Sequence, residues 1–265
     1  MEDFMKQDQF TDVITTESLR QSLGALAKRF VPYAFLSIDS TNAEAKRRAL
    51  DGEDYALIAA EGQTAGRGRM GRNFYSPDCA GVYFSILYRL DEPLSDAVAI
   101  TSAAAVAVMR AVRQICGRQL EIKWVNDLYL DGKKVAGILA ESVTVDGSTS
   151  VIIGIGINLL ESVFPDELAD IAGAIGVNNI DRSKLIAAVL EELLPFLQEP
   201  SDRSWLSDYR AYSCVIGKPI TWFDQSRTDE GIAIDIDNDG ALLVKRQDNT
   251  TARLSTGEIS VRVKG

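Results

Sequence analysis

The chain has 265 residues and a formal net charge of −10, and 46% of its residues are hydrophobic. This apolar share supports a packed core, and the acidic balance argues against a surface that binds duplex DNA, because non-specific DNA affinity depends on neutralising phosphates. Histidine is absent, which excludes a catalytic triad, an HExxH metal site and a histidine general base.

The first half of the chain alternates between helical and strand-like patterns. Leucines at helical spacing and an alanine-rich stretch predict helices, and runs of apolar and aromatic residues predict strands. Thr41 and Glu44 have the spacing of a capping box, which would begin the second helix. The predicted helices are 16–28, 42–50 and 96–116, and the predicted strands are 33–38, 55–60 and 81–88.

The second half begins with strand patterns, and Asp131-Gly132 is a hairpin signal between two of them. A helix over 181–194 should kink or end at Pro195, and a short helix follows over 204–212. Short strands then predict a small barrel appended to an α+β core, with domains 1–212 and 213–265. The predicted strands are 120–125, 134–145, 150–159, 218–223, 230–235, 241–245 and 251–254.

The cysteines and the N-terminus predict the compartment. Cys79, Cys116 and Cys214 are isolated and odd in number, which is typical of reduced thiols in a cytoplasmic protein. The first residues lack a signal peptide pattern, and we expect no window to be long and apolar enough to span a bilayer. We therefore expect a cytoplasmic protein without a membrane partner.

The segment Gly66-Arg67-Gly68-Arg69-Met70-Gly71-Arg72 combines three glycines with three arginines. Glycine permits a close backbone approach, and the arginine fork fits carboxylate and phosphate oxygens. The segment matches G-x-G-x-x-G, but it does not lead from a strand directly into a helix, so the dinucleotide interpretation fails. A loop that wraps a small anion is the functional interpretation, and a solvated surface loop is the alternative.

Glycines also mark the strand Val151-Ile-Ile-Gly-Ile-Gly-Ile-Asn158. Because strand residues alternate between faces, Gly154, Gly156 and Asn158 share one face, and the isoleucines share the other. The isoleucine face predicts core. The bare glycine face indicates a ligand lying flat on the backbone, with close packing of a helix on the sheet as the alternative.

Two polar segments complete the candidate site. Lys123 and Asp127 share a strand face, and Lys134 points to the same cleft unless it belongs to a solvated turn. Trp124 is a core or cleft-wall residue. The hydroxyls and amide of Ser40-Thr41-Asn42 suit either a helix cap or a small neutral polar group such as a ureido ring.

Five blocks, in this order and spacing, resemble the biotin protein ligases over roughly residues 37–160. They are Ser40–Asn42, Gln63–Arg72, Lys123–Asp127, Lys134–Ile138 and Gly154–Asn158. The resemblance implies a class II synthetase-like biotin–lipoate ligase fold, a mixed β-sheet packed with helices, with a small C-terminal SH3-like β-barrel. About forty residues precede Ser40, so we expect a monofunctional form without the winged-helix repressor domain of some relatives.

The resemblance also implies an activity. The family joins biotin to ATP, releasing pyrophosphate and giving biotinyl-5′-AMP, and then transfers biotin to a lysine of a biotin carboxyl carrier protein. The implied biotin-binding residues are Ser40, Thr41, Asn42, Gln63, Arg67, Gly68, Arg69, Lys134 and Gly137. The implied ATP-binding residues are Arg69, Arg72, Lys123, Asn126, Lys134 and Asn158, with Mg²⁺ expected alongside ATP and no protein-only metal site.

The expected chemistry explains the lack of histidine. Biotin's carboxylate is already ionised at neutral pH and needs no base, but it needs cations to approach another anion. Lys134, Arg69 and Arg72 are the expected catalytic residues, and Asp127 is the hypothetical group that positions or deprotonates the carrier lysine. We expect loop 64–73 to be mobile without ligand and ordered over biotinyl-AMP.

Three points stay open at the level of sequence. Val125 stands where the family usually has proline, which changes local rigidity and not the chemistry. A lipoate or octanoate ligase of the same superfamily and a non-catalytic biotin-binding protein are the alternative functions. A homodimer is possible, and no DNA-binding role is expected.

Overall fold

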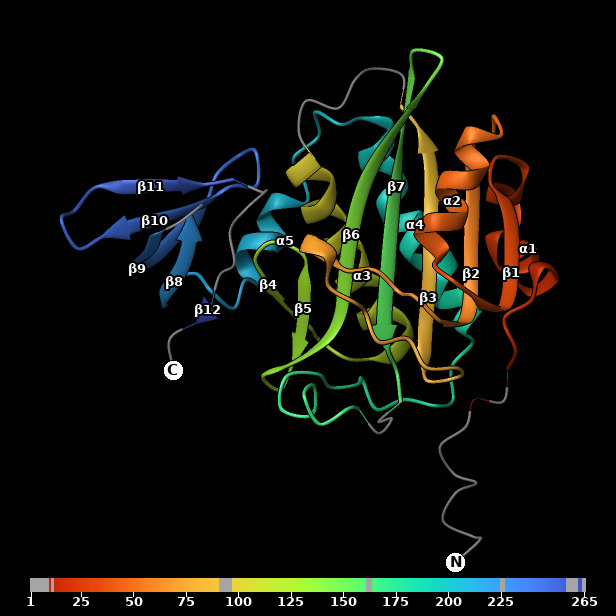
Figure 1. Cartoon of the computed structure of the whole chain (residues 1–265), viewed down its shortest axis with the longest axis horizontal. Helices are drawn as coiled ribbons and strands as arrows, with labels where there is room; N and C mark the ends of the chain where they lie inside the picture. Colours follow the sequence, from red (N-terminus) through yellow and green to blue (C-terminus); the bar gives the residue numbers. More distant parts are fainter. Residues whose placement is uncertain are drawn as a thin grey trace, which may run out of the picture.

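The computed structural model describes residues 10, 12–90, 97–160, 164–224, 227–255 and 262–263. Figure 1 shows a large sheet with helices on both faces and a smaller sheet beyond one of its edges. The large sheet has the strand order β1-β2-β3-β7-β6-β5-β4, with only the β1–β2 pair parallel, so it is mixed as predicted. Its strands are β1 Val31–Ile38, β2 Tyr55–Gln63, β3 Gly81–Arg89, β4 Glu121–Lys123, β5 Asp127–Leu130, β6 Lys133–Val145 and β7 Ser148–Asn158.

Helices cover the two faces of the large sheet unequally. Three of them, α1, α3 and α4, pack behind the sheet as it is drawn in Figure 1, and α2 lies in front of β2, β3 and β7. Leu57 and Ala59 face the large core behind, whereas Ala56 and Ile58 pack under α2, because strand side chains alternate between faces. The helices are α1 Thr16–Leu23, α2 Thr41–Leu50, α3 Ala97–Cys116, α4 Arg182–Gln198 and α5 Leu206–Ala211, with 3-10 helices at Gly24–Lys28 and Arg69–Gly71.

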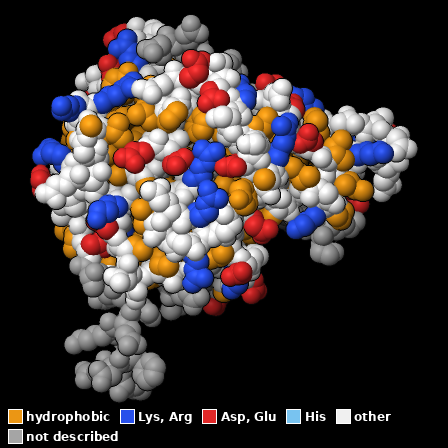
Figure 2. All heavy atoms as spheres, turned by 180° about the vertical axis from the view of Figure 1, so that it is seen from behind, with side chains coloured by type: hydrophobic (Ala, Val, Ile, Leu, Met, Phe, Trp, Pro, Cys, Tyr) orange, Lys and Arg blue, Asp and Glu red, His pale blue; other side chains and the backbone are white. Residues whose placement is uncertain are grey.

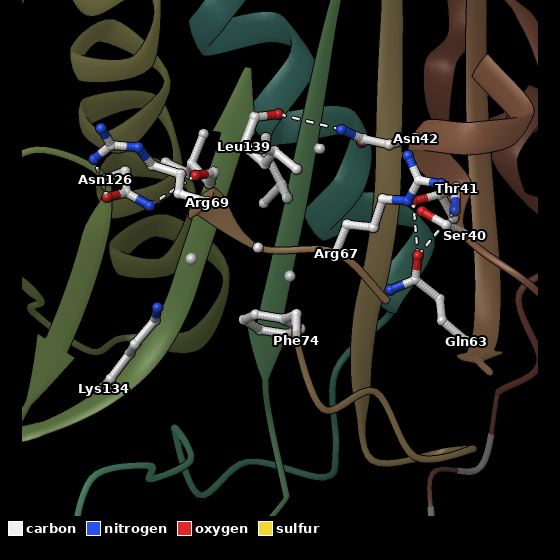
Figure 3. Close-up of a pocket in the computed structure, with 16 residues that line it drawn as sticks. Ser40, Thr41, Asn42, Gln63, Arg67, Arg69, Phe74, Asn126, Lys134 and Leu139 are labelled. Atoms are coloured by element: carbon white, nitrogen blue, oxygen red, sulfur yellow. Dashed lines mark hydrogen bonds between the residues drawn. The ribbon is translucent and has the colours of Figure 1, made fainter. Parts of the chain in front are cut away.

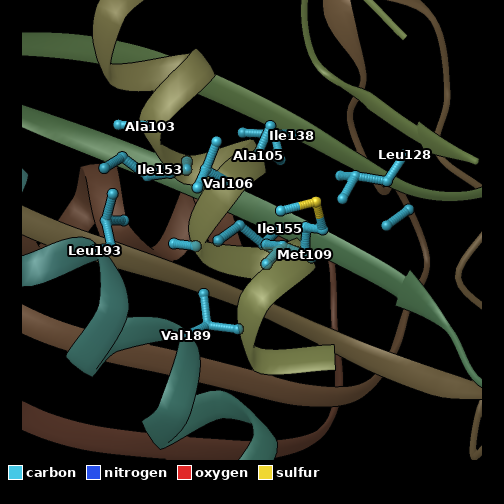
Figure 4. Close-up of a cluster of buried hydrophobic side chains, with 14 of the residues drawn as sticks. Ala103, Ala105, Val106, Met109, Leu128, Ile138, Ile153, Ile155, Val189 and Leu193 are labelled. Carbon is cyan, nitrogen blue, oxygen red and sulfur yellow. The ribbon is translucent and has the colours of Figure 1, made fainter. Parts of the chain in front are cut away.

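The core lies between the back of the sheet and the α3–α4 layer (Figure 4). Val106 and Met109 of α3 and Ile153 and Ile155 of β7 are all buried there. The isoleucine face of β7 is therefore core, as predicted. Its glycine face consequently points to the front of the sheet.

Helix α3 corrects the expectation that no window of the chain is long and apolar enough to span a bilayer. Its stretch Val98–Cys116 is long and apolar enough, by length and composition, to cross a membrane. However, 78% of the tested window is buried inside the fold, which is typical of the core helix of a folded domain.

The surface behind the core carries charges of both signs. Figure 2 shows basic and acidic side chains interspersed on this face. Arg110 of α3, for example, pairs with Glu192 of α4 at 3.3 Å and with Asp208 of α5 at 2.8 Å. These ion pairs tie the helices of the back layer to one another.

Two helices differ in length from the prediction. The predicted helix 16–28 changes to a 3-10 helix at Gly24, where the backbone has a φ of 53°. The helix predicted to kink or end at Pro195 continues to Gln198. Its last turn persists because Phe196 and Leu197 are buried in the core, which offsets the hydrogen bond that proline cannot donate.

The predicted capping box at Thr41 and Glu44 is wrong. The N-cap of α2 is Ser40, whose side chain makes no capping hydrogen bond. Thr41 instead contacts Gln63, with its backbone N donating to Gln63 Oε1 at 2.9 Å. The start of α2 therefore holds its polar side chains toward the front of the sheet rather than toward its own backbone.

The region of the predicted strand 120–125 is a hairpin. Strand β4 ends at Lys123, the Trp124–Val125 peptide bond is cis, and β5 begins at Asp127. The turn at Asp131-Gly132 is confirmed, with φ values of 51° and 78° that suit a type I′ turn.

The smaller sheet has the order β11-β10-β9-β8-β12. Among the described residues β11 and β12 do not pair, so this antiparallel sheet is open and the SH3-like barrel is not confirmed. It shares the core with the large sheet, because Trp222 belongs to the same buried cluster and the Trp124 indole donates to Gly240 O at 2.8 Å. Its strands are β8 Pro219–Asp224, β9 Arg227–Ile236, β10 Leu242–Arg246, β11 Thr251–Leu254 and β12 Arg262–Val263.

Candidate active site

Two cavities lie on the front of the large sheet, on the glycine face of β7. The smaller has a volume of about 50 Å³ and lies between the start of α2 and strands β6 and β7 (Figure 3). Its lining contains the predicted biotin residues Ser40, Thr41, Asn42, Gln63, Arg67, Gly68, Arg69, Lys134 and Gly137. The structure thus brings together residues from three separate sequence blocks, and Asn126, Gly154 and Gly156 of the other two blocks line the same cavity.

Hydrogen bonds fix the polar end of the small cavity. The Thr41 hydroxyl donates to Gln63 Oε1 at 3.2 Å, and Gln63 Nε2 donates to Ser76 Oγ at 2.9 Å. Because each side chain is held by another, the polar groups at this end have a defined orientation before any ligand arrives.

Asn42 is oriented by two residues that sequence reasoning missed. Its Nδ2 donates to Glu141 Oε2 at 2.7 Å, and its Oδ1 accepts from Ser85 Oγ at 2.6 Å. Ser85 is fully buried in β3 and also lies 2.8 Å from Thr41 Oγ1. A polar residue inside the apolar run 82–87 was the available signal for Ser85.

The glycine face is not bare, which corrects the expectation of an open backbone platform. A Cβ at Gly154 would lie 2.0 Å from Asn42 Oδ1, so helix α2 packs closely there, as the alternative interpretation had it. A Cβ at Gly156 would lie 2.4 Å from Cε1 of Phe74, and one at Gly137 would lie 3.1 Å from Cε2 of the same ring. The Phe74 ring, which sequence reasoning missed, covers this pair of neighbouring glycines.

The arginine–glycine segment forms a short hairpin-like loop over the site. Gly68 N donates to Arg72 O at 2.7 Å, and Phe74 N donates to Gly66 O at 2.9 Å. Gly66 must be glycine, because a Cβ there would lie 2.4 Å from Phe74 O. The arginines separate: Arg67 lines the small cavity, Arg72 lines the larger one, and Arg69 lines both.

The larger cavity is a cleft of about 890 Å³ that begins where the small one ends. One part of its wall is apolar and includes Phe164, Leu168, Ile171 and Ala172. The rest is rich in charge. Its charged lining residues are Arg69, Arg72, Glu121, Lys123, Asp127, Lys134 and Lys218.

Lys134 stands where the two cavities meet. Its backbone is fixed by the loop beside it, with Lys134 N donating to Ile171 O at 2.8 Å and Gly173 N donating to Lys134 O at 2.9 Å. Its Nζ lies 2.6 Å from Oδ1 of Asp127. The side chain is therefore held at the junction and is not part of a solvated turn.

Arg69 is the second cation at the junction. It donates to Asn126 Oδ1 at 3.2 Å, and Asn126 Nδ2 donates to Ile138 O at 2.8 Å. Burial lowers the pKa of Arg69, and the opposing charge of Asp127 compensates only in part. The guanidinium stays protonated at neutral pH, so it is a partly desolvated cation that an anion would stabilise.

The remaining candidates line the large cleft. Asn158 Nδ2 donates to Gly173 O at 3.0 Å, and Lys123 Nζ donates to Tyr129 Oη at 3.2 Å. Each candidate residue predicted from the sequence thus lines one or both cavities. Among the described residues, no group of three or more Cys, Asp or Glu side chains could hold a metal ion by itself.

The sequence and the fold match one class of protein. The model of the biotin/lipoate A/B protein ligase family matches residues 34–158, and the model of the biotin protein ligase C-terminal domain matches residues 215–262. The biotin protein ligase of Aquifex aeolicus, solved in complex with biotin and ATP, superposes with a TM-score of 0.76 at 25% identity, covering 88% of this chain and 99% of that one.

Relatives found by sequence similarity belong to the same class of protein. The biotin–[acetyl-CoA-carboxylase] ligase of Mycobacterium tuberculosis is 32% identical over 232 residues, covering 83% of this chain and 85% of that protein. The bifunctional ligase/repressor BirA of Bacillus spizizenii is 37% identical over 206 residues, covering 72% of this chain and 62% of its own length. This chain belongs to the biotin/lipoate A/B protein ligase family. It spans less than two thirds of the length of the two Bacillus relatives.

Proposed function

We propose that this protein is an ATP-dependent biotin protein ligase. It would form biotinyl-5′-AMP with release of pyrophosphate and then transfer biotin to a lysine of a biotin carboxyl carrier protein. The observation that carries the proposal is the position of Lys134, which lines both cavities and can therefore meet a carboxylate from one side and a phosphate from the other.

The small cavity would hold biotin. Its hydroxyls and amides, from Ser40, Thr41, Asn42 and Gln63, offer the mixed donors and acceptors that a cyclic urea needs. Pockets for ligands of this size typically have volumes of about 300 Å³ or more, so the Phe74 ring would have to leave the glycine pair when biotin binds. This movement fits the expectation that loop 64–73 orders over the bound intermediate.

The large cleft would hold ATP. The apolar wall, with Phe164 and Leu168, suits an adenine ring, and the cations Arg69, Arg72 and Lys123 suit phosphates. Mg²⁺ fits as a companion of the nucleotide, because it binds through one or two carboxylates together with phosphates, and Asp127 supplies a carboxylate at the junction.

The first step would need charge stabilisation and no base. Biotin's carboxylate oxygen attacks the α-phosphorus, a new C–O–P linkage forms, and the bond to the leaving pyrophosphate breaks. Lys134 and Arg69 would reduce the repulsion between the two anions and stabilise the charge that develops on the leaving group.

The second step would need a neutral amine. The carrier lysine attacks the biotinyl carbonyl, an amide bond forms, and AMP leaves with the electron pair of the mixed anhydride. Asp127 is the carboxylate beside the reacting atoms in this scheme, and we assign it to position the amine or accept its proton.

Biotin-dependent exchange of radiolabelled pyrophosphate into ATP tests the proposed function. We expect exchange with biotin and none with lipoate or octanoate. Exchange driven by lipoate or octanoate would favour the other branch of the family, and biotin binding without exchange would favour a non-catalytic binding protein.

A further inference from the structure

The large cleft continues beyond the large sheet onto the segment that leads into the small one. The neighbouring strands β7, β6, β5 and β4 contribute Asn158, Lys134, Asp127 and Lys123 to the cleft in that order. Residues 213–214 then continue the row, because Ser213 forms a bridge with Ile122 of β4. The far end of the cleft is therefore built by the C-terminal part of the chain.

Lys218 occupies this far end. It lines the cleft together with Lys123, Glu121, Tyr129 and Cys214. Burial raises the pKa of the Cys214 thiol and Glu121 raises it further, whereas Lys218 and Lys123 both act to lower it, each by less than Glu121 raises it. Two ammonium groups thus lie within Coulombic reach of one sulfur, facing a single glutamate among the described residues that line this end.

The backbone that carries Lys218 is well anchored. Lys218 N donates to Val215 O at 3.0 Å, and Lys218 O accepts from Ala233 N at 3.0 Å. Cys214 N donates to Ile122 O at 2.9 Å, which fixes the same segment to β4. The position of Lys218 relative to Lys123 is consequently set by main-chain bonds on both sides.

The two ends of the cleft differ in the ligand chemistry that they suit. The end beside Asn158 has apolar side chains such as Phe164 and Leu168, which cannot stabilise phosphate charge. The other end has two lysines. Because neighbouring strands are about 4.8 Å apart, β4 lies about 10 Å from Lys134 on β6, in the direction away from the apolar wall.

We propose that Lys218, with Lys123, binds the β- and γ-phosphates of ATP and then the pyrophosphate that they become. The inference rests on the proposed function, in which the α-phosphate reacts beside Lys134. It gives the small C-terminal sheet a direct part in the first half-reaction, because Lys218 immediately precedes β8.

The test compares Lys218→Gln with Lys218→Arg and with Lys245→Gln. Lys245 is an exposed lysine of β10 on the same small sheet and does not line the cleft, so it is the matched control. The KM values for MgATP, pyrophosphate and biotin are measured by biotin-dependent exchange. Transfer from pre-formed biotinyl-AMP to a carrier protein is measured separately.

We expect Lys218→Gln to raise the KM values for MgATP and pyrophosphate about fivefold, as suits an ion pair made by an exposed lysine, with the KM for biotin and the transfer step unchanged. Lys218→Arg should restore most of the loss, and Lys245→Gln should match the wild type. Unchanged KM values for MgATP and pyrophosphate in Lys218→Gln would overturn the inference. So would a defect confined to transfer, which would assign Lys218 to carrier docking.

Failure of the inference and failure of the proposed function are distinguishable. If the wild-type protein shows no biotin-dependent exchange, the proposed function itself is refuted. If the wild type exchanges normally and Lys218→Gln behaves like it, then only the role of Lys218 is refuted.

Discussion

Lys134 Nζ lies 2.6 Å from Asp127 Oδ1, at the junction of the two cavities. Both side chains are partly exposed, at 28% and 26%, so incoming ligands can reach the pair. An ion pair in this place serves two purposes: it holds the ammonium group at the junction, and it keeps a carboxylate beside the atoms that react.

Replacing the Asp127 carboxylate tests its two roles separately. Asp127→Asn should slow transfer from pre-formed biotinyl-AMP to the carrier about 100-fold, because the amine loses the group that positions or deprotonates it. Pyrophosphate exchange should fall less, since Lys134 keeps its charge. Single-turnover transfer assays measure the first effect, and a transfer rate equal to that of the wild type would remove Asp127 from this role.

The paired glycines under Phe74 should differ in their tolerance of a methyl group. Gly156→Ala should weaken biotin binding about tenfold, because biotin would replace the Phe74 ring over Gly156, and a Cβ there would occupy space that the ring approaches to 2.4 Å in the free protein. Gly137→Ala should weaken it less, since its nearest neighbours, the Phe74 ring and Cε of the Lys134 side chain, lie further away, at 3.1 Å. Titration calorimetry with biotin compares the two variants, and an equal or reversed order of affinities contradicts the close approach described here.

A buried cation joins the start of α4 to strand β2 and to the N-terminal segment. Arg182 is fully buried and contacts Glu61 Oε2 at 2.7 Å and Asp12 Oδ1 at 2.8 Å. Arg182→Met should cost about 3–5 kcal/mol of unfolding free energy, because it leaves the buried Glu61 without its partner. It should also weaken biotin binding, since Glu61 is two residues before Gln63 on β2.

Urea unfolding measures this cost, and the double variant Arg182→Met, Glu61→Gln is its control. The double variant should be more stable than the single one, because the unpaired buried charge is removed. A single variant as stable as the wild type would show that the network is not structural.

The ion pair beside Ser40 predicts a pH effect. Hydrogen bonds from Arg47 lower the pKa of Asp39 from 3.8 to about 2. A lowered folded-state pKa contributes stability that is fully present above the unfolded pKa and is lost as the pH falls toward the folded one. The contribution should be no more than about 1 kcal/mol, because both side chains are 48% exposed and solvent screens them.

Urea unfolding of the wild type and Asp39→Asn at pH 7, 4 and 2 measures this effect. The difference in stability between the two proteins should be largest at pH 7 and should shrink between pH 4 and 2. A difference that stays constant over this range would mean that the Arg47 contact does not stabilise the Asp39 carboxylate.

Short-range patterns were enough to predict many parts of the fold and of the site. Alternation along β7 correctly separated the isoleucine core from the glycine face, and Asp131-Gly132 correctly marked a hairpin. Such features depend on neighbours within a few residues, so the sequence alone contains them.

Other features depended on contacts between distant segments. The Phe74 ring covers Gly137 and Gly156, which lie more than sixty residues away, and no local pattern predicts that contact. The hydrogen bond from Ser85 of β3 to Asn42 of α2 likewise joins residues that lie far apart in the sequence. At Pro195, burial of the next side chains outweighed the local helix-breaking tendency.

The proposed role of Lys134 is tested most directly by pyrophosphate–ATP exchange in the wild type and in Lys134→Gln, with thermal unfolding as the folding control. We predict exchange that requires biotin, is not supported by lipoate or octanoate, and falls about 100- to 1,000-fold in a folded Lys134→Gln variant. Exchange without biotin, or an undiminished rate in Lys134→Gln, would contradict a reaction centred on the lysine that joins the two cavities.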